Sequence, residues 1–217
     1  MSRGFIAPLI CSNNLSRIIS MKYKVILFKV FVHLAAFLPL ANAYYLAFTD
    51  QLGADPVEAI IHFTGIGAFN LLLLSLMITP LSKRFKISIL LKVRRLVGLY
   101  SFTYAFLHLT NFLVFEVQFD WSLFVSEILE RPYITIGMAG LLILLTLAIT
   151  SVSLLRKKMG KNWQKLHNWV YLAVVLVGIH FYWSVKSEII EPSIYLFITF
   201  LLLALRFKKL NKWIKKD

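Results

Sequence analysis

Five histidines are the residues of this chain best suited to chemistry, and they lie at positions 33, 62, 108, 167 and 180. A neutral imidazole is a common ligand of metal ions and of haem iron. Cys11 is the only cysteine, which excludes an intramolecular disulfide, a four-cysteine zinc site, an all-cysteine iron–sulfur cluster and the two-cysteine attachment of a c-type haem. A metal or a haem must therefore be held by residues other than cysteine, and the histidines are the first candidates.

His108 and His180 are distinguished by their depth in long uncharged stretches. His108 follows Arg95 by roughly 20 Å of helix and His180 follows Lys165 by roughly 22 Å, at about 1.5 Å per residue. Ionisable residues inside a membrane span are functional hypotheses by default. Two histidines at one depth on different helices suit a b-type haem with two axial imidazoles. The alternative is that each ring bonds a backbone carbonyl or a hydroxyl group instead.

The other three histidines lie nearer the ends of these stretches. His167 is two residues past Lys165 and could bind a second haem at the inner side. However, His167 and His180 are roughly 140° apart around an ideal helix, so they do not share one face. His62 lies at an outer edge and is either a surface histidine or a contact for an outer partner. His33 is interpreted as a hydrogen-bonded histidine within the bundle.

The composition indicates that these histidines are carried by membrane helices. Of 217 residues, 59% are hydrophobic and 16% are charged, with a mean hydropathy of +0.75, whereas soluble proteins carry about 25% charged residues. A spanning helix needs roughly 20 apolar residues, and the final stretch reaches that length only if Arg206 and Lys208 snorkel to the interface. The prediction is an all-α bundle of six transmembrane helices near 25–49, 59–81, 96–116, 132–154, 166–185 and 192–208.

Charge separates the connecting segments into two sets. All but two of the 24 lysines and arginines lie in residues 1–29, 81–95, 156–165 and 206–217. The alternate segments contain every acidic residue except Asp217. Because basic loops remain in the cytoplasm, both termini are expected there, and the number of crossings is even. This asymmetry accounts for the net charge of +14, so no nucleic-acid partner is expected.

Three regions complete the predicted organisation. Residues 1–21 form an N-terminal extension, which is either unstructured or precedes a true start at Met21. Residues 22–212 form the transmembrane domain, and residues 213–217 form a basic tail. Residues 118–131 predict an amphipathic helix on the outer surface. No internal sequence repeat is evident, and no nucleotide-binding motif is present, so any NAD(P)H chemistry must occur on another protein.

Several stretches resemble one family in order and spacing across residues 22–212. They are residues 52–57 with 62–65, residues 94–99 with His108, Arg131-Pro-Tyr133, and residues 160–171 running on to 180–186. These stretches resemble the MsrQ (YedZ) family, the haem-binding membrane subunit of a bacterial methionine sulfoxide reductase system. The resemblance implies a ferric-reductase-like transmembrane fold in the inner membrane, with b-type haem and FMN. It also implies electron transfer from a cytoplasmic flavin reductase or the quinone pool to the periplasmic molybdopterin subunit MsrP.

The resemblance also implies roles for individual residues. His108 and His180 match the axial pair of the outer haem in the wider superfamily, and His167 matches one inner ligand. Related oxidases carry a histidine at the position of Arg94, and a guanidinium cannot ligate iron. One haem is therefore expected, the second is open, and flavin or haem propionates are expected near Arg94 and Arg95. Partner or structural roles are expected for His62, Trp163 and Trp183.

Two other functions compete with this interpretation. A proton-relay transporter would place acids or broken helices at mid-membrane, but all ten acidic residues lie in loops or the tail. A stand-alone ferric reductase of the same fold is the closer alternative, although the chain has no room for a nucleotide-binding domain.

Overall fold

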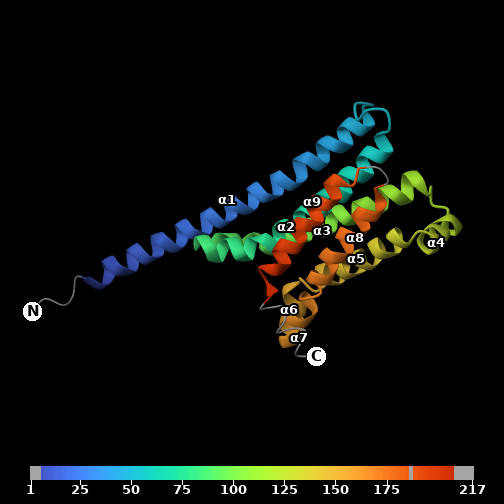
Figure 1. The fold of residues 1–217 in the computed structure, drawn as a ribbon. Helices are drawn as coiled ribbons and strands as arrows, with labels where there is room; N and C mark the ends of the chain where they lie inside the picture. The colour runs from blue at the N-terminus through green and yellow to red at the C-terminus, as the bar shows by residue number, and fades with distance from the viewer. Residues whose placement is uncertain (1–5, 186–187, 208–217) are drawn as a thin grey trace, which may run out of the picture.

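The computed structural model describes residues 6–185 and 188–207, and all regular structure in these residues is helical. Figure 1 shows a bundle of long helices with shorter ones at its ends. The elements are α1 (Ile6–Phe48), α2 (Pro56–Phe85), α3 (Ile89–Asn111), the π-helical segment η1 (Phe112–Glu116), α4 (Trp121–Glu130), α5 (Pro132–Ile149), α6 (Ser153–Met159), α7 (Lys161–His167), α8 (Val170–Ser184) and α9 (Ile190–Ala204).

The first helix begins much earlier than expected. Helix α1 starts at Ile6, so it includes residues 6–21 of the predicted N-terminal extension. Pro8 lies in the first turn, where proline is tolerated. Residues 9–38 contain neither glycine nor proline, so the two strongest helix breakers are absent from this stretch.

Two of the predicted long helices are interrupted at one end of the bundle. The helix expected over 132–154 ends at Ile149, and the one expected over 166–185 is divided into α7 and α8. Thr150 and Ser151 donate their hydroxyl protons back to the carbonyls of Thr146 (2.7 Å) and Leu147 (2.8 Å), and such local bonds compete with helix continuation. Gly160, with a φ of 53°, separates α6 from α7.

Side-chain contacts give the direction of the first three helices. Helices α1 and α3 are parallel, because the residue numbers of the contacting pairs increase together along both helices. The pairs are His33 with Tyr100, the Ala36 carbonyl with Tyr104, and Tyr44 with Asn111. Helices α2 and α3 are antiparallel, because Ser101 bonds the Ala68 carbonyl whereas His108 bonds the Ile61 carbonyl.

The remaining helices continue the alternation. Helix α8 runs opposite to α9, since Gly178 lies against Leu196 and Tyr171 against Arg206. It also runs opposite to α5, as the contacts of Tyr133 with His180 and of Gly140 with Val177 demonstrate. Helix α9 is parallel to α2, which links the two sets: Phe69 stacks on Tyr195, and Leu76 bonds Arg206. The six long helices of the described residues are α1, α2, α3, α5, α8 and α9, and they therefore alternate in direction.

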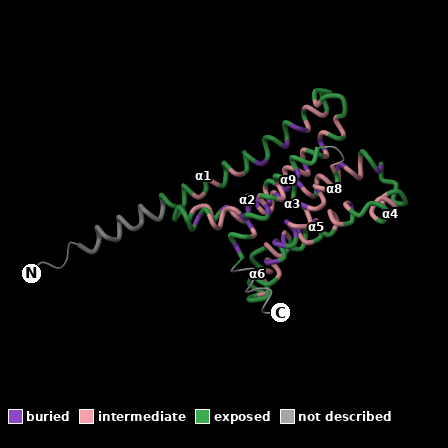
Figure 2. Tube along the Cα trace, viewed as in Figure 1, coloured by how far each residue is buried: buried purple, intermediate pink, exposed green. Residues whose placement is uncertain are grey.

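Apolar side chains lie both inside and outside the bundle. The main core joins α2 and α8, where Phe69, Leu72, Ala173 and Val174 are almost fully buried. Many large apolar side chains nevertheless face outward, and Figure 2 shows helix α1 as largely exposed. In the described residues, five helices are long and apolar enough to cross a membrane, while the sixth apolar helix, Ile190–Ala204, is shorter. The chain is a multi-pass membrane protein whose outer surface suits lipid.

Candidate haem site

His108 of α3 and His180 of α8 approach each other inside the bundle. Their ring centroids are 6.1 Å apart, and the ring planes are nearly perpendicular, at 83°. Both side chains are half-buried. The two histidines predicted to share one depth are thus neighbours in space, although they lie 72 positions apart in the sequence.

Each of these rings is held through one nitrogen by a backbone carbonyl. The Nδ1 of His108 lies 2.9 Å from the Ile61 oxygen on α2, and the Nδ1 of His180 lies 2.7 Å from the Tyr133 oxygen on α5. A carbonyl can only accept, so Nδ1 must carry the proton in both rings. In the neutral imidazole, Nε2 then keeps its lone pair, which is the arrangement that second-shell carbonyls impose on metal-bound histidine.

The spacing of the two rings fits a metal ion held between them. A metal–imidazole bond measures about 2 Å, so ring centroids 6.1 Å apart leave room for one ion that His108 and His180 could hold. Among the described residues, no group of three or more His, Cys, Asp or Glu side chains could hold a metal ion. A haem iron, in contrast, would need only the two histidines as protein ligands.

The Arg131-Pro132-Tyr133 segment connects this pair to helix α4. Pro132 begins α5, so the Tyr133 carbonyl lies in its first turn. The ring of Tyr133 is 6.1 Å from that of His180. Arg131 donates to the Tyr133 hydroxyl (3.2 Å) and pairs with Glu127 of α4 (2.9 Å). The position of His180 is therefore coupled to the α4–α5 corner.

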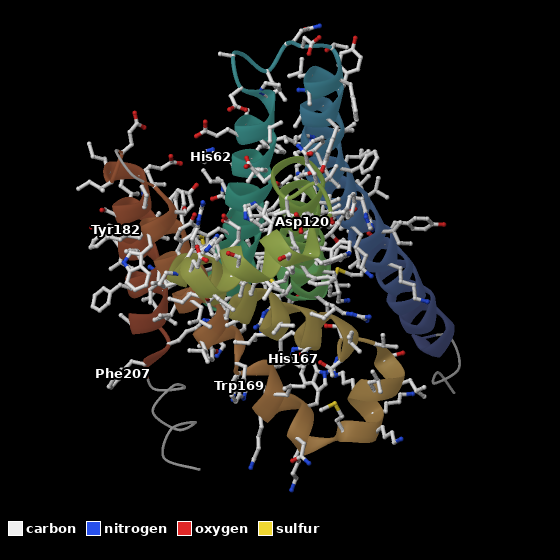
Figure 3. All side chains as sticks on the ribbon, turned by 90° about the vertical axis from the view of Figure 1, so that its right-hand side faces the viewer. His62, Asp120, His167, Trp169, Tyr182 and Phe207 are labelled. Atoms are coloured by element: carbon white, nitrogen blue, oxygen red, sulfur yellow. The ribbon has the colours of Figure 1, made fainter. Side chains whose placement is uncertain are left out.

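His167 lies elsewhere, at the end of the bundle that carries α6 and α7. Its ring stacks on Trp163 at 3.9 Å, and its Nε2 lies 3.2 Å from the Thr150 hydroxyl. Trp163 in turn donates from Nε1 to the Thr150 carbonyl (2.9 Å) and lies under the Arg156 guanidinium. Figure 3 shows His167 and His62 toward opposite ends of the molecule. The structure does not bring His167 to the His108–His180 pair.

The predicted arginines differ in exposure. Arg94 is half-buried and lies within electrostatic range of Arg206 and His167, whereas Arg95 is exposed. Arg206, which would lengthen the last span if it snorkelled to the interface, is only 8% exposed. It points into the bundle because its guanidinium donates to the Tyr171 hydroxyl (2.9 Å) and to the Leu76 carbonyl.

His62 and Trp183 lie close to the surface. His62 is exposed, with its ring 6.3 Å from that of the buried Phe181. Trp183 is 53% exposed. Neither side chain touches the His108–His180 rings through a contact seen in the described residues.

Sequence reasoning missed the glycines beside the paired histidines. A Cβ on Gly65 would lie 3.0 Å from Nδ1 of His108, and a Cβ on Gly137 would lie 2.6 Å from Nδ1 of His180. One signal was present in the chain: Gly65 precedes His108, and Gly137 precedes His180, by the same 43 residues.

Comparison with known proteins identifies the family. Residues 64–178, just over half of the chain, match the family described as ferric reductase like transmembrane component. The chain is 44% identical over 186 residues to the protein-methionine-sulfoxide reductase heme-binding subunit MsrQ of Klebsiella pneumoniae (strain 342), covering 85% of this chain and 94% of that protein. It is 45% identical to the MsrQ of Cronobacter sakazakii, covering 85% and 93% respectively. The chain therefore belongs to the MsrQ family of ferric-reductase-like transmembrane proteins.

Proposed function

We propose that this protein is the haem-binding, electron-transferring membrane subunit of a methionine sulfoxide reductase system. The relatives at 44–45% identity are named as heme-binding subunits of protein-methionine-sulfoxide reductase. The observation that carries the proposal is the 6.1 Å approach of two imidazoles whose Nδ1 atoms are both held by carbonyls. His108 and His180 would hold a b-type haem, and the bound haem supplies one-electron transfer.

The histidines act as ligands and not as acid–base catalysts. Each carbonyl fixes the orientation of its ring and leaves Nε2 as the ligand atom. The surrounding apolar helices limit the access of water to the site. This burial and the basicity of the two imidazole ligands would together set the reduction potential of a bound haem. The chain does not itself reduce methionine sulfoxide in this proposal; a periplasmic molybdopterin subunit of the MsrP type does so.

The proposed orientation places electron entry at the basic end. All six long helices cross the bacterial inner membrane, both termini are cytoplasmic, and the acidic connections face the periplasm. The alternating helix directions and the uneven distribution of lysine and arginine support this orientation. A cytoplasmic flavin reductase or a quinone would donate at the end that carries α6 and α7.

FMN is proposed to bind near Arg94 and Arg95 at that same end. The half-buried Arg94 lies close enough to Arg206 for the two charges to interact, and no carboxylate pairs with either in the described part of the chain. Two neighbouring guanidinium groups favour an anionic group such as a phosphate. A stand-alone transmembrane ferric reductase remains the alternative function, since it would use the same histidine pair.

The proposal is tested by reduced-minus-oxidised absorption spectra and a pyridine haemochrome count on the purified protein. The variants are His108→Ala and His180→Ala. The matched control is His33→Ala, since His33 is exposed and bonded to the Tyr100 hydroxyl (2.6 Å). We expect a b-type spectrum in the wild type and the control, and its loss in both site variants.

The count and the partner assay separate the alternatives. A colourless wild type expressed with ample haem would contradict the electron-transfer function. Reduction of a purified MsrP-type subunit by the reduced haem protein supports the proposed pathway. Reduction of ferric chelates with no transfer to that subunit would favour the stand-alone reductase.

A further inference from the structure

Two helix pairs hold their histidines in the same way. In the first pair, α2 provides the Ile61 carbonyl and Gly65, and α3 provides His108. In the second, α5 provides the Tyr133 carbonyl and Gly137, and α8 provides His180. In each pair the glycine follows the carbonyl residue by four positions. The arrangement recurs although the two segments, Ile-His-Phe-Thr-Gly and Tyr-Ile-Thr-Ile-Gly, are dissimilar.

The spacing of four explains why the residue is glycine. In an α-helix, residues four apart lie on the same face, and a side chain leans back over the preceding turn. A side chain at position 65 or 137 would therefore cover the carbonyl of residue 61 or 133. Glycine leaves that carbonyl open on its free side, so an imidazole from the neighbouring helix can approach and donate from Nδ1.

The available space differs between the two sites. A Cβ at Gly137 would meet His180 at Nδ1 (2.6 Å), Cε1 (2.8 Å) and Cγ (3.1 Å). The clash includes Cγ, the ring atom bonded to Cβ of His180, so a small rotation of the ring cannot relieve it. At Gly65 the corresponding distances to His108 are 3.0, 3.1 and 3.8 Å, so a Cβ there would crowd only Nδ1 and Cε1 of the ring.

We infer that Gly65 and Gly137 are positioning residues for the axial ligands: each keeps one carbonyl open so that the ring of its histidine is fixed with Nε2 available. This inference rests on the proposed function, because the ring is positioned for haem. Outer partners of a ligand histidine typically change metal affinity by about 10–100-fold when they are lost. Gly137 controls its ring more strongly than Gly65 because its contact is closer.

The test compares Gly137→Ala and Gly65→Ala with two alanine controls. An added Cβ at Gly98 would meet no atom within 4 Å, and Gly140 packs on Val177 at the same α5–α8 contact as Gly137 without touching a histidine (3.3 Å). The readouts are haem affinity, from titration of the apoprotein with haemin, and the low-spin EPR signal of the oxidised protein. The signal depends on the angle between the imidazole planes, which is 83° here.

We expect a clear order of effects. Gly137→Ala should weaken haem affinity by about 10–100-fold and shift the EPR signal. Gly65→Ala should shift the EPR signal with a smaller loss of affinity, while Gly98→Ala and Gly140→Ala should match the wild type. An added methyl group changes no charge, so such shifts would report ring position.

Two results would overturn the inference. One is an unchanged affinity and EPR signal in both Gly137→Ala and Gly65→Ala. The other is an equal loss in Gly140→Ala, which would make the effect one of helix packing. If Gly137→Ala fails to fold, Gly65→Ala against Gly98→Ala decides the question in the same way. A wild type without haem would instead contradict the proposed function, so the two failures are distinguishable.

Discussion

At the residue scale, the availability of imidazole nitrogens separates the five histidines. His108 and His180 each bond a carbonyl through Nδ1 and leave Nε2 for a ligand role. His167 instead places Nε2 against the Thr150 hydroxyl and stacks on Trp163. A residue type alone therefore does not make a ligand, because the hydrogen bond at one nitrogen determines what the other can do.

This difference predicts that His167→Ala retains the haem held by His108 and His180. We expect a haemochrome count equal to that of the wild type if one haem is bound, since His167 does not reach the pair. A fall to the level of His180→Ala would contradict this prediction. A fall from two haems to one would mean that His167 ligates a second haem despite Arg94.

At the element scale, glycines determine how closely the helices approach. A Cβ on Gly67 would lie 2.5 Å from the ring of Tyr104, which joins α2 to α3. The Tyr104 hydroxyl is fixed by its bond to the Ala36 carbonyl of α1 (2.6 Å). At Gly178, in contrast, the nearest atom is the flexible Cδ2 of Leu196 at 2.9 Å. The same added methyl group thus meets a fixed ring in one place and a movable side chain in the other.

We therefore expect Gly67→Ala to lower the thermal unfolding midpoint in detergent more than Gly178→Ala. Overpacking against a ring that cannot move costs about 1–3 kcal/mol, whereas the leucine side chain can change rotamer. Gly98→Ala, in open space, is the control for the change in helix propensity. Equal midpoints for Gly67→Ala and Gly98→Ala would contradict this account of the α2–α3 contact.

At the scale of the whole molecule, the charge distribution and the helix directions indicate the same orientation in the membrane. The six long helices alternate in direction, and nearly all lysines and arginines lie at one set of connections. Basic residues near helix ends resist translocation across the membrane. The end that carries α6 and α7, together with its basic segment 156–165, is therefore expected in the cytoplasm, and α4 in the periplasm.

Cysteine accessibility tests this orientation, because Cys11 is the only native cysteine. In a Cys11→Ser background, Asp120→Cys at the start of α4 should react with a membrane-impermeant maleimide in spheroplasts. Lys158→Cys in α6 should react only after the membrane is disrupted. The reverse pattern would contradict the proposed orientation.

The N-terminal segment offers a second test at this scale. The side-chain bonds that join α1 to α3 begin at His33 and extend to Tyr44. A protein that starts at Met21 retains all of these bonds. We expect it to insert and to bind as much haem as the full chain, measured by the haemochrome count. Loss of haem on removal of residues 1–20 would show that this part of α1 supports the bundle.

The amino-acid sequence by itself determined the features that depend on local composition. The long uncharged stretches predicted the apolar helices, the amphipathic segment at 118–131 predicted α4, and equal depth marked His108 and His180 as a candidate ligand pair. Each of these follows from helix geometry and from the cost of charge in a membrane, which act along a single segment.

Only the tertiary structure decided the contacts between segments. It brought the carbonyls of Ile61 and Tyr133 to the two histidines, placed His167 on Thr150, and turned Arg206 inward to Tyr171 and Leu76. A helix carbonyl open to a neighbouring side chain leaves no signal in residue type, except the glycine that uncovers it. Such contacts depend on how helices distant in the sequence are rotated against one another, and no local pattern specifies that rotation.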